Sequence, residues 1–364
     1  MVSRGFSCSL GLRRPTPLLL LLLLVQLAAT QNAVCPHECI PVTECPQFME
    51  LLNNPTLEEV KILQKATCSI PSAASSDPMV CCPTDTTSPI TSLLPQRCGQ
   101  GPELDRIHGG TEVPLSGYPW MAVFGYSGLA GIAFLCGGSV INERYVLTAA
   151  HCVHDSLLQT KPLEVIRLGE WDLSTEEDCE VTNQGYEDCA PPVQDLTYEE
   201  IIIHPDYNTR ARYSDDIALI RLSRSVDISG RSIQAVCLPP QGQEPRSVLD
   251  QRQAVVAGWG TTENGTTSDK MLHVTLPMVD RATCNATYQG ILVDEQICFG
   301  GESGKDSCKG DSGGPLLVPG PRGPPFFQIG VVSYGPTICA IDAFPGVYTS
   351  VSYYRSWIEK NLKP

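Results

Sequence analysis

Short hydrophobic runs, separated by glycine, proline and polar residues, recur along the chain after residue 107. They are rich in Val, Ile and Leu, and they lie at 146–147, 165–168, 201–203, 217–220, 255–257 and 329–332. Many short strands with turn residues between them predict an all-β barrel or sandwich. The tail is different: within 353–360, Tyr354, Trp357 and Ile358 recur at helical spacing, which predicts a C-terminal helix.

The first 30 residues have another pattern. Arg4, Arg13 and Arg14 precede an unbroken apolar run at 18–25, and small residues follow it. This order of basic, apolar and small residues is typical of a secretory signal peptide. A membrane anchor is the alternative, but it needs about 20 apolar residues. We therefore expect residues 1–30 to be a cleaved signal peptide and the protein to be secreted, extracellular and free of a membrane anchor.

Composition narrows the functional classes. The 364 residues include 40 acidic and 25 basic side chains, for a formal net charge of −15. A nucleic-acid-binding protein would need a basic face for the phosphates, so this balance argues against that class. The chain has 17 cysteines, and removal of the leader with Cys8 leaves 16. An even number of cysteines in an oxidising compartment predicts eight disulfides.

Six cysteines are concentrated in residues 31–83, at positions 35, 39, 45, 68, 81 and 82. A unit of this size has too small a core to fold without covalent support, which favours disulfides. Zinc is the alternative, but paired CxxC motifs are missing and the protein is expected to be secreted. Residues 84–106 lack hydrophobic periodicity and are interpreted as a linker, so that 107–364 forms the second domain.

Three motifs in residues 107–364 carry candidate catalytic residues. In chain order they are TAAHC with His151, DIAL with Asp216 and GDSGGP with Ser312. A serine hydroxyl becomes an effective nucleophile when a base takes its proton. An imidazole can be that base near neutral pH, and a carboxylate can hold the imidazole in the right tautomer. The order His, Asp, Ser is one of the few known for this constellation.

These motifs make residues 107–364 similar to the trypsin-type serine proteases of the chymotrypsin fold. The resemblance implies two six-stranded antiparallel β-barrels with the active site between them. It implies His151 as general base and then general acid, Asp216 as its orienting carboxylate and Ser312 as nucleophile. The amides of Gly310 and Ser312 would form the oxyanion hole. No cofactor is implied for the chemistry.

The resemblance also implies a specificity. It places Asp306 at the base of the substrate pocket, with Ser333, Gly335 and Gly346 along the walls. A carboxylate in a narrow pocket favours a cationic side chain, so we expect cleavage after Arg or Lys. Ile338 stands where trypsins usually have glycine, and we expect it to narrow the pocket entrance.

Activation is implied by the sequence LDRIHGG at 104–110, which matches the activation site of the family. Cleavage between Arg106 and Ile107 would create an α-amino group at Ile107, and Asp311 would be its partner. The disulfide pairs that the resemblance implies for residues 84–364 are Cys98–Cys237, Cys136–Cys152, Cys284–Cys298 and Cys308–Cys339, with Cys179–Cys189 in an insertion.

The cysteine pattern of residues 31–83 resembles the clip domain of arthropod serine proteases. The clip pairing would be Cys35–Cys81, Cys39–Cys68 and Cys45–Cys82, with a small helical section between Leu51 and Leu63. Members of this family are secreted zymogens in extracellular cascades. The insertion 179–189 is similar to that of the Easter and prophenoloxidase-activating branch. Within that branch, the numbers of known members favour innate immunity, by prophenoloxidase activation, melanisation or Toll-ligand processing, over development.

That resemblance also implies partners, which are an upstream trypsin-like activating protease, a downstream zymogen or cytokine precursor as substrate, and serpin inhibitors. Three alternatives are weighed against it. A catalytically silent homologue acting as a binding cofactor typically lacks the serine, whereas Ser312 is present. A developmental cascade is disfavoured only by the numbers of known family members. A digestive trypsin would not need the cysteine-rich front domain.

Residues 170–200 contain eleven acidic side chains and no Lys or Arg. Calcium prefers carboxylate and carbonyl oxygens from one flexible loop. Related proteases bind calcium here, which makes Glu170 and Asp195 candidate ligands. A solvated acidic loop and a surface that attracts a basic partner are the alternatives.

Two N-x-T sequons, at Asn264 and Asn285, predict glycosylation, with unmodified surface asparagines as the alternative.

Overall fold

The structure is a computed structural model of the chain. It describes residues 39–42, 45, 67–69, 79–81, 93–101, 111–128, 131–182, 184–239, 253–262, 265–302, 310–320, 323–336 and 343–364. The chain divides into two compact units, Met1–Ile90 and Thr91–Pro364. Among the helices of the described residues, none has the length and apolar character needed to cross a bilayer. The expected signal peptide, residues 1–30, lies outside this description.

The first unit contains a three-stranded antiparallel sheet of order β1-β3-β2, with β1 (Cys39–Pro41), β2 (Thr67–Ser69) and β3 (Met79–Cys81). Cys45, Cys68 and Cys81 are disulfide-bonded, and Cys45 and Val80 are almost completely buried. Bonded cysteines therefore take the place of a large core here, as a unit of this size requires. The expected helical section between Leu51 and Leu63 lies outside the described residues.

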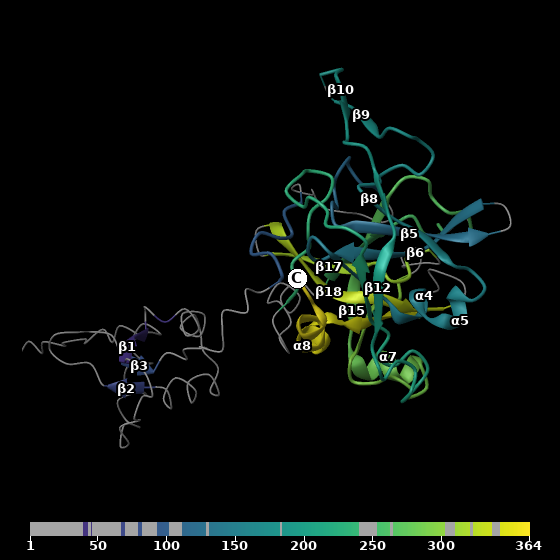
Figure 1. The fold of residues 1–364 in the computed structure, drawn as a ribbon. Helices are drawn as coiled ribbons and strands as arrows, with labels where there is room; N and C mark the ends of the chain where they lie inside the picture. Colours follow the sequence, from purple (N-terminus) through teal and green to yellow (C-terminus); the bar gives the residue numbers. More distant parts are fainter. Residues whose placement is uncertain are drawn as a thin grey trace, which may run out of the picture. The chain divides into compact units, whose positions relative to one another are not determined.

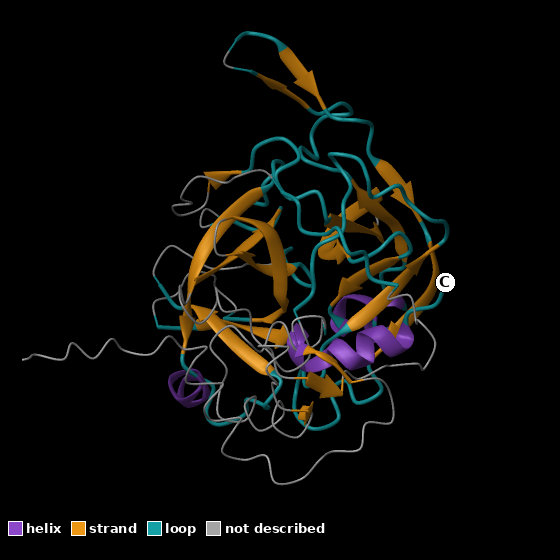
Figure 2. Ribbon diagram, turned by 90° about the vertical axis from the view of Figure 1, so that its left-hand side faces the viewer, coloured by secondary structure: helices purple, strands orange, loops and turns teal. Residues whose placement is uncertain are grey.

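The second unit is built from two antiparallel sheets, which curve into neighbouring barrels (Figure 2). The first sheet has the order β11-β8-β5-β6-β7-β13-β12. The strands β11 and β12 are separated by one residue, yet they lie at opposite edges, so the stretch 194–203 closes the barrel. Its strands are β5 (Met121–Gly128), β6 (Gly131–Val140), β7 (Tyr145–Thr148), β8 (Leu163–Leu168), β11 (Gln194–Leu196), β12 (Tyr198–Ile203) and β13 (Ala218–Leu222).

The second sheet has the order β14-β17-β18-β19-β16-β15-β4, and an additional β14–β15 pairing closes it. Its strands are β4 (Thr111–Glu112), β14 (Gln253–Gly258), β15 (Leu272–Val279), β16 (Gln296–Gly300), β17 (Pro315–Gly320), β18 (Gly323–Tyr334) and β19 (Pro345–Ser350). The β14–β15 pairing covers strand edges that an open sheet would leave unpaired. The prediction of an all-β double barrel is confirmed, but each sheet has seven strands and not the expected six, because β11 and β12 are separate strands in the first and β4 joins the second.

The helices of the described residues lie around the barrels (Figure 1): α4 (Ala150–Val153), α5 (Asp155–Leu158), α7 (Arg281–Thr287) and α8 (Val351–Asn361). The predicted C-terminal helix is α8, which buries Tyr354 and Ile358 against the core of the first barrel. The sequence analysis did not predict α7. This helix begins after Asp280, whose carboxylate accepts a hydrogen bond from the Thr283 amide at 3.0 Å and so caps the first turn.

A separate hairpin, β9 (Cys179–Val181) with β10 (Glu187–Cys189), projects from the barrels (Figures 1 and 2). A disulfide joins Cys179 to Cys189 at its base. The Arg231 guanidinium binds both carboxylate oxygens of Asp188, each at 2.9 Å. The base of the hairpin is thus fixed, while Tyr186 near its tip is exposed.

Residues 93–101 are attached to the second unit in several ways. Cys98 forms a disulfide with Cys237, and the Gly99 amide donates to the Ala235 carbonyl at 2.7 Å. The Asn142 side chain donates to the Leu93 carbonyl at 2.9 Å. Backbone and disulfide contacts therefore hold this segment in place upstream of residue 107.

A buried histidine connects the region before β5 to β15 of the second barrel. Tyr118 Oη lies 2.8 Å from His273 Nδ1, and both side chains are buried. Burial penalises the charged imidazolium and lowers the pKa of His273 to about 4. The folded protein therefore keeps His273 neutral at pH values where the unfolded chain would protonate it.

This arrangement predicts acid-dependent stability. Because an unfolded histidine titrates near 6.5, the free energy of unfolding should fall as the pH drops from about 6.5 toward 4, by at most about 1.4 kcal/mol per pH unit from this group. His273→Gln should reduce that slope. Denaturant unfolding of the uncleaved protein at pH 7 and pH 5 measures this pH dependence of the free energy of unfolding. Equal pH dependence in the variant and the wild type would contradict a titrating role for His273.

Candidate active site

Two of the candidate catalytic residues are brought together at the edge of the first barrel. His151 lies in α4, directly after β7, and Asp216 directly precedes the Ile217–β13 stretch, which pairs with β7. The His151 Nδ1 atom lies 2.8 Å from Asp216 Oδ2, and the His151 amide donates to Asp216 Oδ1 at 2.9 Å. Asp216 is completely buried. The carboxylate thus fixes both the ring and the backbone of the histidine.

The Asp216 carboxylate is held by a third donor, the hydroxyl of Ser333 in β18, at 2.5 Å from Oδ2. Its backbone carbonyl accepts from Thr349 Oγ1 in β19 at 2.9 Å. Strands of the second barrel therefore orient a carboxylate that belongs to the first barrel. Ser333 was expected only as a wall of the substrate pocket, and Thr349 was not singled out.

Electrostatics favour a basic imidazole. Burial by itself would lower the pKa of His151, but the negative charge of Asp216 and the hydrogen bond to it outweigh that effect, so that the pKa is raised above 6.5. A raised pKa makes the imidazole a better proton acceptor once the pH is high enough to deprotonate it. With Nδ1 directed to Asp216, Nε2 is the atom left to exchange a proton with a nucleophile.

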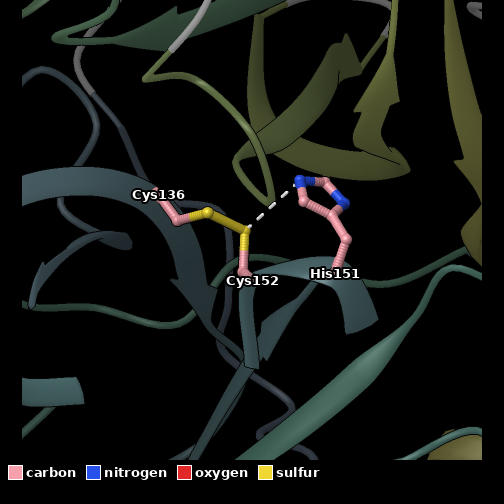
Figure 3. Close-up of side chains that lie close together, drawn as sticks. All are labelled: Cys136, His151 and Cys152. Carbon is pink, nitrogen blue, oxygen red and sulfur yellow. Dashed lines mark hydrogen bonds between the residues drawn. A yellow bond between two sulfur atoms is a disulfide. The ribbon is translucent and has the colours of Figure 1, made fainter. Parts of the chain in front are cut away.

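The Nε2 atom lies 3.6 Å from Cys152 Sγ, and Cys152 forms a disulfide with Cys136 (Figure 3). A disulfide sulfur is a weak hydrogen-bond acceptor. In the described part of the chain, no hydrogen bond joins His151 to Ser312. The imidazole edge that would meet the serine is therefore bound only weakly, as is common in enzymes without substrate.

Ser312 lies in a turn just before β17, and this turn is tied to both barrels. The Gly137 amide of β6 donates to the Ser312 carbonyl at 2.7 Å, and the Gly313 amide donates to the Val332 carbonyl of β18 at 2.9 Å. Gly137 adjoins Cys136, which is linked by its disulfide to the neighbour of His151. These connections position the serine turn beside the histidine turn.

The oxyanion hole is expected from the amides of Gly310 and Ser312, and the backbone at Gly310 is unusual. Gly310 has φ +106°, a conformation that side-chain-bearing residues rarely adopt. A Cβ at Gly310 would lie 2.9 Å from the Cα of Gly260. In the described residues, neither the Gly310 amide nor the Ser312 amide donates to a backbone carbonyl. These two N–H groups are the ones expected to bind a developing oxyanion.

The Asp311 carboxylate occupies space that is free because residue 260 is a glycine and has no side chain. Its Oδ1 accepts from the Gly260 amide at 3.0 Å, and a Cβ at Gly260 would lie 2.5 Å from the Asp311 carboxyl carbon. The carboxylate is therefore adjacent to the oxyanion-hole residue Gly310. Its expected partner, the α-amino group of Ile107, lies outside the described residues, as does Arg106.

The substrate pocket is described only in part. Gly335 and Gly346 lie side by side, since a Cβ at Gly335 would be 3.8 Å from the Gly346 Cα. The backbone near the expected pocket entrance is therefore not obstructed by side chains at these two positions. Asp306 and Ile338 lie outside the described residues, and their placement stays a prediction.

An aromatic contact beside His151 was missed in the sequence. The Tyr213 ring meets the His151 ring edge-on, with centroids 5.8 Å apart, and stacks on Tyr334 at 5.3 Å. The rings come from a loop, a helix and a strand distant in sequence, so no motif could have indicated their contact. Tyr213 limits how far the imidazole can move.

The calcium expectation needs a correction in its second ligand. Both carboxylate oxygens of Asp195 are bound by Arg167, at 2.7 and 2.8 Å, so Asp195 already has a cation and does not fit as a ligand. Glu170 also contacts Arg167, but it is buried, and its oxygen shares the Trp171 amide with Asp178. Desolvation and the charge of Asp178 raise the pKa of Glu170. Calcium binding stays a prediction.

The remaining expected sites are placed as follows. Four disulfides join described residues: Cys98–Cys237, Cys136–Cys152, Cys179–Cys189 and Cys284–Cys298. Asn285 lies in α7, partly buried, and its Oδ1 accepts from the Leu292 amide at 3.2 Å, which constrains a glycan at this position. Asn264 and the Cys308–Cys339 pair lie outside the described residues.

Comparison with known proteins agrees with this architecture. Residues 107–358 match the family model for trypsin, and residues 36–82 match that for the regulatory CLIP domain of proteinases. The chain is 39% identical to Melanization protease 1 of Drosophila melanogaster, over 89% of this chain and 90% of the relative. It is 39% identical to Phenoloxidase-activating factor 1 of Holotrichia diomphalia, over 90% of this chain and 91% of the relative.

A solved structure gives the same result. The crystal structure of the Drosophila Grass clip serine protease of the Toll pathway superposes with a TM-score of 0.66 at 37% identity, covering 90% of this chain and 96% of that one. The fold is thus similar along almost the whole length of both chains.

Proposed function

Because this chain belongs to the clip-domain serine proteases of the trypsin family, we propose that it is the secreted zymogen of an endopeptidase that cleaves after Arg or Lys. The observation that carries the proposal is the buried Asp216 carboxylate, hydrogen-bonded to His151 beside the Ser312 turn. A buried carboxylate that orients an imidazole near a serine is suited to acyl transfer.

The proposed reaction assigns one role to each of these groups. Ser312 Oγ attacks the scissile carbonyl carbon while His151 Nε2 takes its proton, and Asp216 stabilises the resulting imidazolium. The amides of Gly310 and Ser312 bind the oxyanion of the tetrahedral intermediate. The C–N bond then breaks, the leaving amine takes the proton from His151, and water hydrolyses the acyl-enzyme by the same steps.

The pathway is proposed from the relatives. Their names refer to melanization, to phenoloxidase activation and to processing of Spaetzle. We propose an extracellular cascade of innate immunity, in which a trypsin-like protease activates this chain. The activated enzyme would cleave a downstream zymogen or cytokine precursor and be inhibited by serpins. Arg106 before the expected activation bond supports a trypsin-like activator.

Specificity gives the first test of this proposal. In the activated enzyme, Asp306→Ser should lower kcat/KM for substrates with Arg before the scissile bond by about 100-fold or more, because a buried cationic side chain would lose its counterion. Reaction with a small acylating reagent, which does not use the pocket, should change little. A peptide library that showed a preference for aromatic residues before the cut would contradict the assignment of Asp306.

The role of the front domain gives a second test. We expect the clip domain to dock protein substrates, since its disulfide-bonded cysteines offer no nucleophile. An enzyme deleted before Cys98 should cleave small peptides as fast as the full chain after activation, but should cleave its protein substrate more slowly. Equal rates on the protein substrate would exclude a docking role.

A further inference from the structure

Two buried acids lie next to the catalytic aspartate. Asp215 precedes Asp216 in the chain and is 3% exposed, and Glu295, which precedes β16, is completely buried. One oxygen of Glu295, Oε2, is buried without a hydrogen-bond partner. Buried carboxylates are costly unless a cation compensates them. The cation that serves both acids in the described structure is Arg210.

The guanidinium of Arg210 binds the two acids at once. Its Nη2 lies 2.8 Å from each oxygen of Asp215, its Nε donates to Asp215 Oδ2 at 3.2 Å, and Nη2 also contacts Glu295 Oε1. Asp215 comes from the first barrel and Glu295 from the second. A single side chain thus connects the two barrels immediately behind the catalytic carboxylate.

The other groups that lie near Asp215 do not supply the positive charge that Arg210 provides. Tyr354 Oη of α8 donates to Asp215 Oδ1 at 2.7 Å, and His204 Nδ1 lies 3.7 Å from the same oxygen. Burial lowers the pKa of His204, which favours its neutral form. His204, Asp206 and Asp215 place possible metal-ligand atoms within 4.8 Å of one another, but a metal ion there would face the Arg210 guanidinium.

Next to the catalytic pair, the loop that carries Arg210 is strained at two positions. Asn208, earlier in the same loop, also has positive φ, at +59°, a conformation that asparagine tolerates better than most residues. Tyr213 has φ +61° and Asp215 has φ +54°, conformations that non-glycine residues rarely adopt. Such strain persists only where surrounding contacts maintain it. Packing on His151 and Tyr334 holds Tyr213 in its conformation. The guanidinium of Arg210 holds Asp215 in its conformation. The strained residues are also the ones adjacent to the catalytic pair.

We propose that Arg210 is a positioning residue of the active site: its pairing with Asp215 and Glu295 keeps the 204–215 loop in the geometry that holds Asp216 and Tyr213 against His151. Arg210 acts through these residues and touches none of the reacting atoms. The inference rests on the proposed protease activity.

The test measures kcat and KM of the activated enzyme on a peptide nitroanilide with Arg before the scissile bond, per titrated active site. Arg210→Gln should lower kcat about tenfold, equivalent to about 1.4 kcal/mol, while KM changes by less than about twofold. Arg224→Gln is the matched control: Arg224 is exposed, forms no ion pair with a described residue, and donates to the side chain of Gln194. That control should keep kcat within about twofold.

A second substitution that restores activity would distinguish charge compensation from other roles of Arg210. In Arg210→Gln, two carboxylates are left buried without a cation, so adding Glu295→Gln should restore most of kcat. Arg210→Lys keeps the charge without the fork and should give an intermediate kcat. If Arg210→Gln is not secreted, recovery of secretion and activity in the double variant supports the proposal, and failure of that recovery overturns it.

Three results would overturn the inference. The first is an unchanged kcat in Arg210→Gln. The second is a loss confined to KM, which would make Arg210 a substrate contact. The third is a kcat loss that Glu295→Gln leaves in place. A wild-type enzyme with no activity after cleavage at Arg106 would instead contradict the proposed function, and so the two failures are distinguishable.

Discussion

Replacement of Ser312 by alanine is expected to lower kcat of the activated enzyme by at least about 10⁴-fold, with the fold retained. The reason is that no other hydroxyl lies in the turn that Gly137 and Val332 hold beside His151. The loss should appear in hydrolysis of a peptide ester or nitroanilide, measured on purified protein with an unchanged thermal unfolding midpoint.

Ser333→Ala provides the matched comparison, since it removes a serine hydroxyl of the same site. That hydroxyl only donates to Asp216, which keeps two other hydrogen bonds from His151. We expect a loss of about tenfold from this variant, corresponding to one hydrogen bond to a charged group. If both serine variants lost activity equally, the distinction between nucleophile and orienting residue would be wrong.

Replacement of Arg106 by glutamine should prevent activation altogether. A trypsin-like activator would find no basic residue before Ile107, so the α-amino group that pairs with Asp311 would never form. The Asp311 carboxylate adjoins Gly310, and therefore the oxyanion hole depends on what Asp311 binds. Activity after addition of the upstream protease should stay at the level of the uncleaved chain.

The control for this experiment is Arg97→Gln. Arg97 is exposed and lies in the same segment, one residue before the Cys98–Cys237 disulfide. Cleavage and activation of this variant should proceed at the wild-type rate. Appearance of activity in Arg106→Gln while Ile107 is still internal would contradict the activation mechanism.

Local patterns in the sequence were sufficient for the parts of the fold that depend on local chemistry. Alternating short apolar runs predicted the barrels, and helical spacing of Tyr354, Trp357 and Ile358 predicted α8. The short helix α7 could also have been found, because Asp280 followed by Thr283 is a capping pattern. Motif spacing identified His151 and Asp216, although 65 residues separate them.

Contacts that depend on the tertiary structure could not be predicted from local sequence patterns. The cross-strand pairing of Asp195 with Arg167 follows from the register of β11 on β8, and it removes Asp195 from the candidate calcium ligands. Arg210 and Glu295 are 85 residues apart and belong to no motif. Their pairing follows from how the two barrels meet, which no local pattern encodes.

The central claim is that cleavage between Arg106 and Ile107 makes Ser312 reactive. The most direct measurement is peptide mapping by mass spectrometry after treatment with a fluorophosphonate, on the intact chain and on the chain cut by an upstream protease. The account predicts that the phosphonyl group is found on Ser312, and only in protein whose second chain begins at Ile107. Equal labelling of Ser312 in the uncut chain, or absence of label on Ser312 after the cut, would contradict it.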